Sequence, residues 1–95
     1  MTIFSKDLGI IHFVGIGGIG MSGIAEVLFE LGYQITGSDI SISSNIDRLK
    51  KLGIKIYIGQ DRKNITNASI IVISSAIKED NVELVTANLN KIPIV

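Results

Sequence analysis

Short apolar runs alternate along this chain with stretches whose apolar residues recur at helical spacing. The runs with strand character cover residues 10–14, 34–38, 54–58, 69–74 and 93–95. Because strands that alternate with helices pair in parallel through right-handed crossovers, the pattern predicts an α/β fold, with a Rossmann-like parallel sheet of about five strands flanked by helices. We expect the strand order 3-2-1-4-5, which places the first strand at the centre and the strictly alternating third strand at an edge.

The stretch after the first strand has the spacing of a helix. Its apolar positions are predicted to share one buried face, and they are Ile24, Val27, Leu28 and Leu31. The acidic residues Glu26 and Glu30 fall on another face. Gly32 stands where a glycine in the left-handed conformation commonly ends a helix.

Two later helices have recognisable first residues. Ser44 is the expected cap of a helix that ends at Gly53, because a serine followed one turn later by an acidic residue is typical of a helix start. Asp80 is the expected cap of the last helix. That helix would carry the apolar residues Val82, Val85 and Leu89. Residues 60–68 are polar and predict a turn with a short helix.

Length and composition limit what the chain can be. Its 95 residues leave room for one small domain, which we expect at residues 10–95 after an N-terminal extension at residues 1–9. A formal net charge of zero argues against a nucleic-acid partner or an anionic membrane surface. The absence of cysteine excludes disulfides and thiolate sites, and the single histidine excludes a His-rich metal cluster within the chain.

The uncharged stretch at residues 8–25 is not expected to cross a membrane. A spanning helix needs about 20 predominantly apolar residues, and glycines interrupt this stretch repeatedly. No signal-peptide cleavage pattern follows it. The expected location is therefore the cytoplasm.

The main chemical signal is a glycine-rich loop between the first strand and the first helix. Residues 15–20 read Gly-Ile-Gly-Gly-Ile-Gly, the G-x-G-x-x-G fingerprint in the context it requires. Gly17 lacks a Cβ and would let a phosphate approach the backbone, and Gly20 would let the helix pack closely on the strand. Free amides at the helix start favour an anion, so the loop predicts a nucleoside diphosphate ligand; a glycine-rich turn without ligand is the alternative. No Gly-Lys-Ser/Thr is present, so this is not a Walker-type ATP loop.

Two further segments are expected beside the loop. Asp39 ends the second strand and can accept hydrogen bonds from ribose hydroxyls, although an aspartate in an ordinary surface turn is the alternative. Small residues at positions 74–77 follow the fourth strand and would let a ligand lie close, although an ordinary polar loop fits as well.

The remaining polar residues have structural interpretations. His12 lies within the first strand and is expected to be a packed, hydrogen-bonded residue rather than a catalyst. A solvated helix face accounts for the charged residues Asp47, Arg48, Lys50 and Lys51. No acid–base pair, nucleophile–base pair or metal cluster can be assembled, so these residues predict a nucleotide-binding module rather than a complete enzyme, with NAD as the favoured ligand.

The residues around the glycine-rich loop indicate a protein family more specifically than the G-x-G-x-x-G fingerprint does. Residues 12–25, HFVGIGGIGMSGIA, closely resemble the start of the Mur ligase family, and within it the enzymes that join L-alanine to UDP-N-acetylmuramate. The segments Leu-Gly-Tyr at 31–33, Gly-Ser-Asp at 37–39, Arg-Leu at 48–49 and Ser-Ser-Ala-Ile at 74–77 also fall where that family has them. The resemblance covers about residues 10–95, nearly the whole chain.

The resemblance implies the first part of a three-domain, ATP-dependent ligase of peptidoglycan synthesis. In that family the N-terminal domain binds the UDP part of UDP-N-acetylmuramate, a central domain binds ATP and Mg²⁺, and a C-terminal domain helps to bind L-alanine. The muramate carboxylate is phosphorylated to an acyl phosphate, which the amine of L-alanine attacks. This chain resembles the first domain alone, so we expect it to have no ligase activity and no cofactor of its own.

By position, the resemblance also implies which residues bind UDP. The diphosphate would lie against the loop and the first turn of the helix, and the uridine near the ends of the second and fourth strands. The residues so implied are Gly15, Ile16, Gly17, Gly18, Ile19, Gly20, Met21, Ser22, Ser38, Asp39, Ser74, Ser75, Ala76 and Ile77. The chain departs from the family pattern at Ile46, Gln60 and Val82, where the family often has Thr, His and Pro.

A different function class shares the loop. The spacing from Gly20 to Asp39 is also typical of NAD(P)-binding domains of dehydrogenases, and a nucleotide-sensing regulatory module would look similar. The resemblance favours the UDP-sugar ligand over these alternatives.

Overall fold

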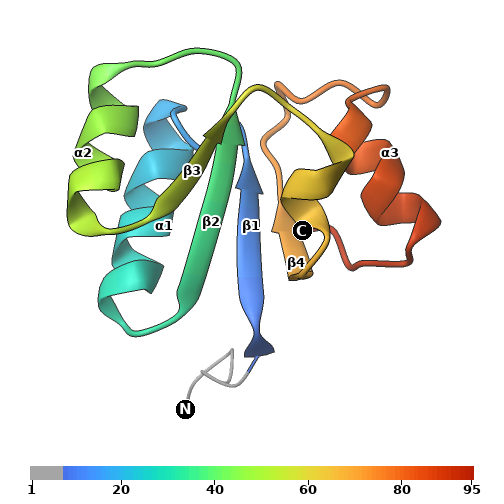
Figure 1. Cartoon of the computed structure of the whole chain (residues 1–95), viewed down its shortest axis with the longest axis horizontal. Coiled ribbons are helices and arrows are strands. Elements are labelled where there is room, and N and C mark those ends of the chain that lie inside the picture. Colours follow the sequence, from blue (N-terminus) through green and yellow to red (C-terminus); the bar gives the residue numbers. More distant parts are fainter. Residues whose placement is uncertain (1–7) are drawn as a thin grey trace.

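A parallel sheet of four strands in the order β3-β2-β1-β4 forms the centre of the computed structural model, which describes residues 8–95 (Figure 1). The strands are β1 (Ile10–Val14), β2 (Gln34–Asp39), β3 (Lys55–Ile58) and β4 (Ala68–Val72). All three pairings are parallel. The predicted α/β fold, the strand order and the edge position of β3 are confirmed.

The predicted fifth strand is present only as a single bridge, so the expected count of five was wrong by one. Ile94 pairs in parallel with Ile71 of β4. The Ile71 amide donates to the Pro93 carbonyl and the Val95 amide donates to the Ile71 carbonyl, both at 2.9 Å. Residues 93–95 therefore lie beside β4, where the predicted order puts the fifth strand, but they pair at too few positions to form one.

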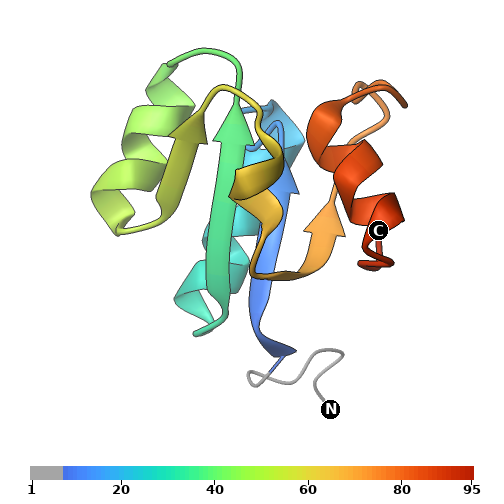
Figure 2. The same ribbon diagram turned by 45° about the vertical axis from the view of Figure 1, so that its right-hand side comes forward.

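Helices cover both faces of the sheet (Figures 1 and 2). One face packs against α1 (Ile19–Glu30) and α2 (Ser44–Leu52), which an ion pair between Glu26 and Arg48 also joins. The other face packs against the short 3₁₀ helix η2 (Arg62–Ile65) and against α3 (Val82–Leu89). The turn with a short helix predicted at residues 60–68 corresponds to η2.

The central strand β1 is buried on both faces. Ile11 and Phe13 belong to an apolar cluster that includes residues of α1 and α2. Val14 belongs to a second cluster, with Ile65 of η2 and Ala87 of α3. The loop that follows β1 is therefore anchored by two separate cores.

The buried face of α1 differs from the predicted one. Ile24, Val27 and Leu31 are 52%, 58% and 54% exposed, and Leu28 is half-buried. The buried residues of the helix are Met21, Ser22 and Ala25. Apolar residues occur around most of this helix, so spacing alone does not select the face that packs on the sheet.

The two predicted N-caps were each wrong by one residue. Ser43 caps α2 by accepting a hydrogen bond from the Ile46 amide at 3.3 Å, in place of Ser44. Asn81 caps α3, in place of Asp80. The neighbouring residues are also good caps by type, so composition could not choose between them. The helix α3 includes Val82, Val85 and Leu89, as predicted. These three residues are at least 40% exposed, and the buried residues of the helix are Glu83, Leu84 and Ala87.

The glycine that permits close packing near the loop is not the predicted one. A Cβ on Gly20 would have no atom within 4 Å, whereas a Cβ on Gly37 of β2 would lie 2.4 Å from the Ile16 side chain. The helix stops at Gly32 and Gly53 are confirmed, with φ angles of +101° and +106°. Gly37, rather than Gly20, therefore lets the loop settle on the sheet.

The structure describes only part of the expected N-terminal extension at residues 1–9. Residues 1–7 of the expected N-terminal extension lie outside the described residues. None of the helices within residues 8–95 combines the length and the apolar character needed to cross a membrane.

Candidate functional site

A cavity of about 390 Å³ opens at the carboxyl edge of the sheet, beside the turn that follows β1. At this edge the chain leaves β1 toward β2 on one side and leaves β4 toward residues 93–95 on the other, which is where α/β sheets generally bind ligands. The residues that line the cavity are Gly15, Asp39, Ile40, Gln60, Ala76, Ile77, Lys78, Asp80 and Asn81.

Part of the predicted site lines this cavity. Gly15, Asp39, Ala76 and Ile77 do so, from three segments far apart in the sequence. The other predicted site residues lie outside the lining: Ile16, Gly17, Gly18, Ile19, Gly20, Met21, Ser22, Ser38, Ser74 and Ser75. The pattern of residues did not predict five of the lining residues, which are Ile40, Gln60, Lys78, Asp80 and Asn81. Each follows the carboxyl end of a strand, and that position was the signal that could have found them.

The protein itself engages the first amides of the glycine loop. The Gly15 and Ile16 amides donate to the Ser38 carbonyl oxygen at 2.9 and 3.0 Å. The Gly17 amide donates to Asp39 Oδ2 at 2.8 Å. These contacts fix the loop against the end of β2.

The amides at the start of α1 have no such partners. Gly18 is the N-cap residue and offers no side-chain cap. The first bond inside the helix runs from the Ser22 amide to the Gly18 carbonyl at 2.9 Å. Within residues 8–95 the amides of Ile19, Gly20 and Met21 find no acceptor. Consecutive free N–H groups at the positive end of a helix dipole favour an anion.

Asp39 connects the loop to the cavity. Its Oδ2 accepts from the Gly17 amide and its Oδ1 accepts from the Ile40 amide, both at 2.8 Å. Each carboxylate oxygen has a second lone pair, so the half-buried Asp39 can still accept a hydroxyl from a ligand in the cavity.

The turn after β4 packs against the loop. Ser74 shapes the turn, since its Oγ accepts from the Ala76 amide at 3.3 Å and its carbonyl accepts from the Ile77 amide at 3.1 Å. A Cβ on Gly15 would lie 3.1 Å from Ile77 Cδ1, and Gly15 has a φ of +76°. Both features require glycine at the tight turn after β1.

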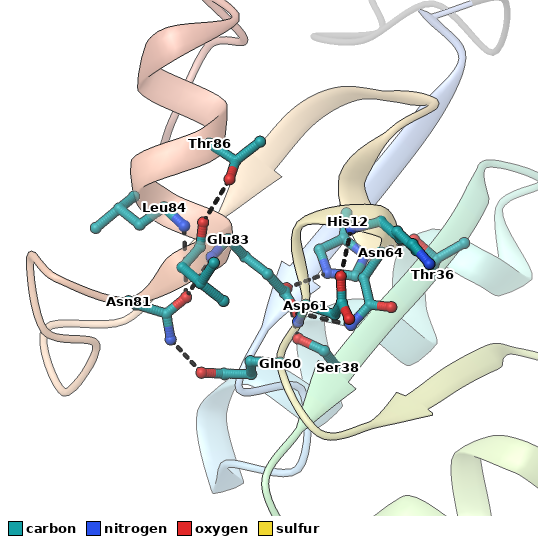
Figure 3. Close-up of polar contacts among 12 residues, drawn as sticks. His12, Thr36, Ser38, Gln60, Asp61, Asn64, Asn81, Glu83, Leu84 and Thr86 are labelled. Atoms are coloured by element: carbon teal, nitrogen blue, oxygen red, sulfur yellow. Dashed lines mark hydrogen bonds and ion pairs between the residues drawn. The ribbon is translucent and has the colours of Figure 1, made fainter.

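Two residues after Asn81, which lines the cavity, the buried carboxylate of Glu83 receives four hydrogen bonds (Figure 3). Glu83 Oε1 accepts from His12 Nε2 and from Ser38 Oγ, both at 2.7 Å. Glu83 Oε2 accepts from the Asp61 amide at 3.1 Å and from Asn64 Nδ2 at 2.8 Å. The carboxylate thus joins β1, β2, η2 and α3, and a full set of donors is what a buried charge requires.

The donors around Glu83 decide its protonation state. Burial acts to raise the pKa of this carboxyl, but the hydrogen bonds from His12, Ser38 and Asn64 outweigh burial and lower the pKa below its ordinary value. The other ring nitrogen of His12, Nδ1, lies 2.7 Å from Thr36 Oγ1. His12 is fully buried and hydrogen-bonded on both nitrogens, which confirms the packed role predicted for it.

An amide pair forms one wall of the cavity. Asn81 Nδ2 donates to Gln60 Oε1, and both residues line the cavity. Asn81 Oδ1 caps α3 by accepting from the Glu83 amide at 2.9 Å. The wall is therefore continuous with the buried network, because Glu83 also holds the Asp61 amide next to Gln60.

The charged side chains around the cavity are few. Its lining carries the carboxylates of Asp39 and Asp80 and the ammonium of Lys78. Across residues 8–95, no group of three or more His, Cys, Asp or Glu side chains is placed to hold a metal ion.

Sequence comparison connects this geometry with known proteins. The sequence model described as "Mur ligase family, catalytic domain" matches residues 10–95. The UDP-N-acetylmuramate--L-alanine ligase of Xanthobacter autotrophicus is 59% identical over 90 residues, which make up 95% of this chain and 19% of that enzyme. The resemblance found around residues 12–25 is confirmed, and the chain spans about a fifth of the length of the curated relatives it matches.

Solved structures agree with the sequence comparison. The UDP-N-acetylmuramate-alanine ligase of Thermotoga maritima has a TM-score of 0.87 and 38% identity, over 90% of this chain and 20% of that one. A second solved structure has a TM-score of 0.79 and 32% identity. It is the UDP-N-acetylmuramate:L-alanyl-gamma-D-glutamyl-meso-diaminopimelate ligase from Neisseria meningitides. That similarity covers 92% of this chain and 28% of the ligase.

Proposed function

Because this chain belongs to the Mur ligase family, we propose that it binds the UDP part of UDP-N-acetylmuramate. It would do so as the N-terminal, substrate-binding part of an ATP-dependent ligase that joins L-alanine to that substrate in peptidoglycan synthesis. The relatives that support this proposal are named UDP-N-acetylmuramate--L-alanine ligases and are 53% to 59% identical to the chain.

The observation that carries the proposal is the row of free amides at Ile19, Gly20 and Met21. In the proposed complex these N–H groups donate to the diphosphate, and the N-terminal dipole of α1 stabilises its negative charge. Gly18, Ile19 and Gly20 are exposed, so an anion can approach this end of α1 from solvent.

The uridine would then extend into the adjacent cavity. The Asp39 carboxylate, next to the loop, is placed to accept ribose hydroxyls on its remaining lone pairs. The apolar side chains of Ile40 and Ile77 and the amide pair of Gln60 and Asn81 line the same space. A flat base with polar edges suits a cavity with apolar sides and a polar wall.

No chemical step is assigned to this chain. In the proposed enzyme, other parts of the ligase would hold ATP, Mg²⁺ and L-alanine, and ATP would supply the phosphoryl group that activates the muramate carboxylate. The contribution of these residues is to bind and orient the nucleotide. We therefore expect the chain by itself to bind UDP and to form no amide bond.

Calorimetric titration of the chain with UDP, UDP-N-acetylmuramate and NAD tests the proposal. We expect both uridine nucleotides to bind and NAD to bind more weakly or not at all. Tighter binding of NAD than of UDP would contradict the proposal and favour the dehydrogenase-type alternative, which rests on the spacing of Gly20 and Asp39.

A further inference from the structure

Gly17 is held from two directions by side chains of neighbouring elements. Its amide donates to Asp39 Oδ2 at the end of β2, at 2.8 Å. Its carbonyl accepts from Asn45 Nδ2 in the first turn of α2, at 3.1 Å. Both peptide groups that flank this glycine are therefore tied to the protein.

The room around Gly17 fits this arrangement closely. A Cβ at this position would lie 2.8 Å from Asp39 Oδ2 and 3.1 Å from the Ile46 side chain. Ile46 is fully buried and Asn45 is half-buried. Phosphate approach is the reason predicted from the sequence for a glycine at this position, but contacts with the protein's own side chains already require one.

The Asn45 bond affects the peptide group just before the free amides. The peptide between Gly17 and Gly18 is fixed at both ends, because Asn45 binds its carbonyl and its N–H donates to the Gly15 carbonyl at 3.1 Å. Without these bonds a glycine pair would rotate freely. Fixing this peptide sets the direction in which α1 begins.

The same bond also bears on the Met21 amide. In a helix that began one residue earlier, the Gly17 carbonyl would accept from the Met21 amide, four residues on. Here the carbonyl is turned to Asn45, and the first intrahelical bond starts at Gly18. Asn45 thus keeps the Met21 amide available to a ligand.

We infer that Asn45 is a positioning residue for the diphosphate. By binding the Gly17 carbonyl, it keeps that carbonyl from accepting a hydrogen bond from the Met21 amide within α1. This inference rests on the proposed function, since it assumes that the free amides bind the diphosphate. Asn45 does not line the cavity and is not among the residues that the family resemblance implied for UDP.

The test compares ligands with and without phosphates. The variant Asn45→Ala removes the donor, and alanine is the stronger helix former, so α2 should not be weakened. We expect UDP affinity, measured by NMR titration, to fall about three- to tenfold, as the loss of one hydrogen bond implies. Uridine has no diphosphate, so its affinity should change by less than about twofold. The matched control is Asn88→Ala in α3, an exposed helical asparagine, which should leave both affinities unchanged.

A second variant separates the hydrogen bond from side-chain shape. Asn45→Asp keeps the shape and suits a helix N-terminus, but an ionised aspartate cannot donate to a carbonyl. It should weaken UDP binding at least as much as Asn45→Ala does. Equal losses of UDP and uridine affinity, or no loss in either variant, would overturn the role of Asn45. Failure of the unmodified chain to bind UDP would instead overturn the proposed function.

Discussion

The His12 imidazole lies with its Nε2 2.7 Å from Glu83 Oε1, and both side chains are fully buried. This contact joins the central strand to α3 across 71 positions of sequence. Asn81, which caps α3 by accepting from the Glu83 amide, also lines the cavity. The buried pair therefore helps to fix the position of one wall of the candidate site.

Replacing Glu83 with Gln should destabilise the fold by about 3 kcal/mol. An amide NH₂ in place of Oε2 would face two obligatory donors, the Asp61 amide and Asn64 Nδ2. An amide NH₂ in place of Oε1 would require His12 to change tautomer and Ser38 to turn its hydroxyl. Urea unfolding followed by circular dichroism measures the loss. The control Glu79→Gln removes an exposed carboxylate and should change stability by less than about 0.5 kcal/mol. Equal stability of the two variants would show that the network does not hold the fold.

Stability should decrease in acid because of the same carboxylate. The pKa of Glu83 is lowered in the folded chain, so its stabilising contribution is complete above its ordinary value of 4.5 and is lost as the pH falls through the lower folded-state pKa. Unfolding free energies measured from pH 7 down to pH 3 should show this decline. In Glu83→Gln the decline should be shallower, and an unchanged slope in that variant would assign the acid sensitivity to other carboxylates.

A negative charge at Ile19 should weaken diphosphate binding without loss of the fold. Ile19 is 91% exposed and is the first residue of α1, next to the free amides. Ile19→Glu places a carboxylate beside the proposed diphosphate, and the affinity for UDP should fall at least about tenfold. The melting temperature should stay equal or rise, because glutamate is favourable in a first helical turn. Ile19→Gln is the neutral control, and equal UDP affinity in the Glu and Gln variants would place the diphosphate elsewhere.

Two glycines should respond in opposite ways to alanine. At Gly37 the new Cβ would lie 2.4 Å from Ile16, and the overpacking should cost about 1–3 kcal/mol. At Gly20 the Cβ would meet open space within α1, so alanine should stabilise the helix by about 0.5–1 kcal/mol. Thermal unfolding of both variants provides the comparison, and a destabilised Gly20→Ala would mean that the helix start is more crowded than its surroundings indicate.

The sequence predicted most of the strands and their order, because apolar runs and turn residues are local signals. β1 begins and ends where the pattern placed it, and Gly32 and Gly53 end their helices with positive φ angles. The choice of N-caps failed where two suitable residues adjoin, as at Ser43 and Ser44. Residue type limits which residues can cap a helix, but the residue at which the backbone turns from extended to helical is the one that does so.

The candidate site was only partly predictable. The glycine loop and Asp39 were identifiable because their residue types and spacing follow from the geometry of a strand-turn-helix unit. Gln60 and Asn81 were not identified as cavity residues, because their meeting depends on crossovers that bring the ends of β3 and β4 to one edge.

By itself the sequence determined the alternation of strands and helices, the glycine-rich loop after the first strand and the family to which the chain belongs. Only the tertiary structure decided which loop amides stay free, since Ser38 and Asp39 engage the first of them and Asn45 holds the carbonyl of Gly17. It also decided that Glu83 would be buried against His12. Periodicity and turn chemistry act over a few residues, whereas hydrogen-bond partners are set by which distant segments the folded sheet brings together.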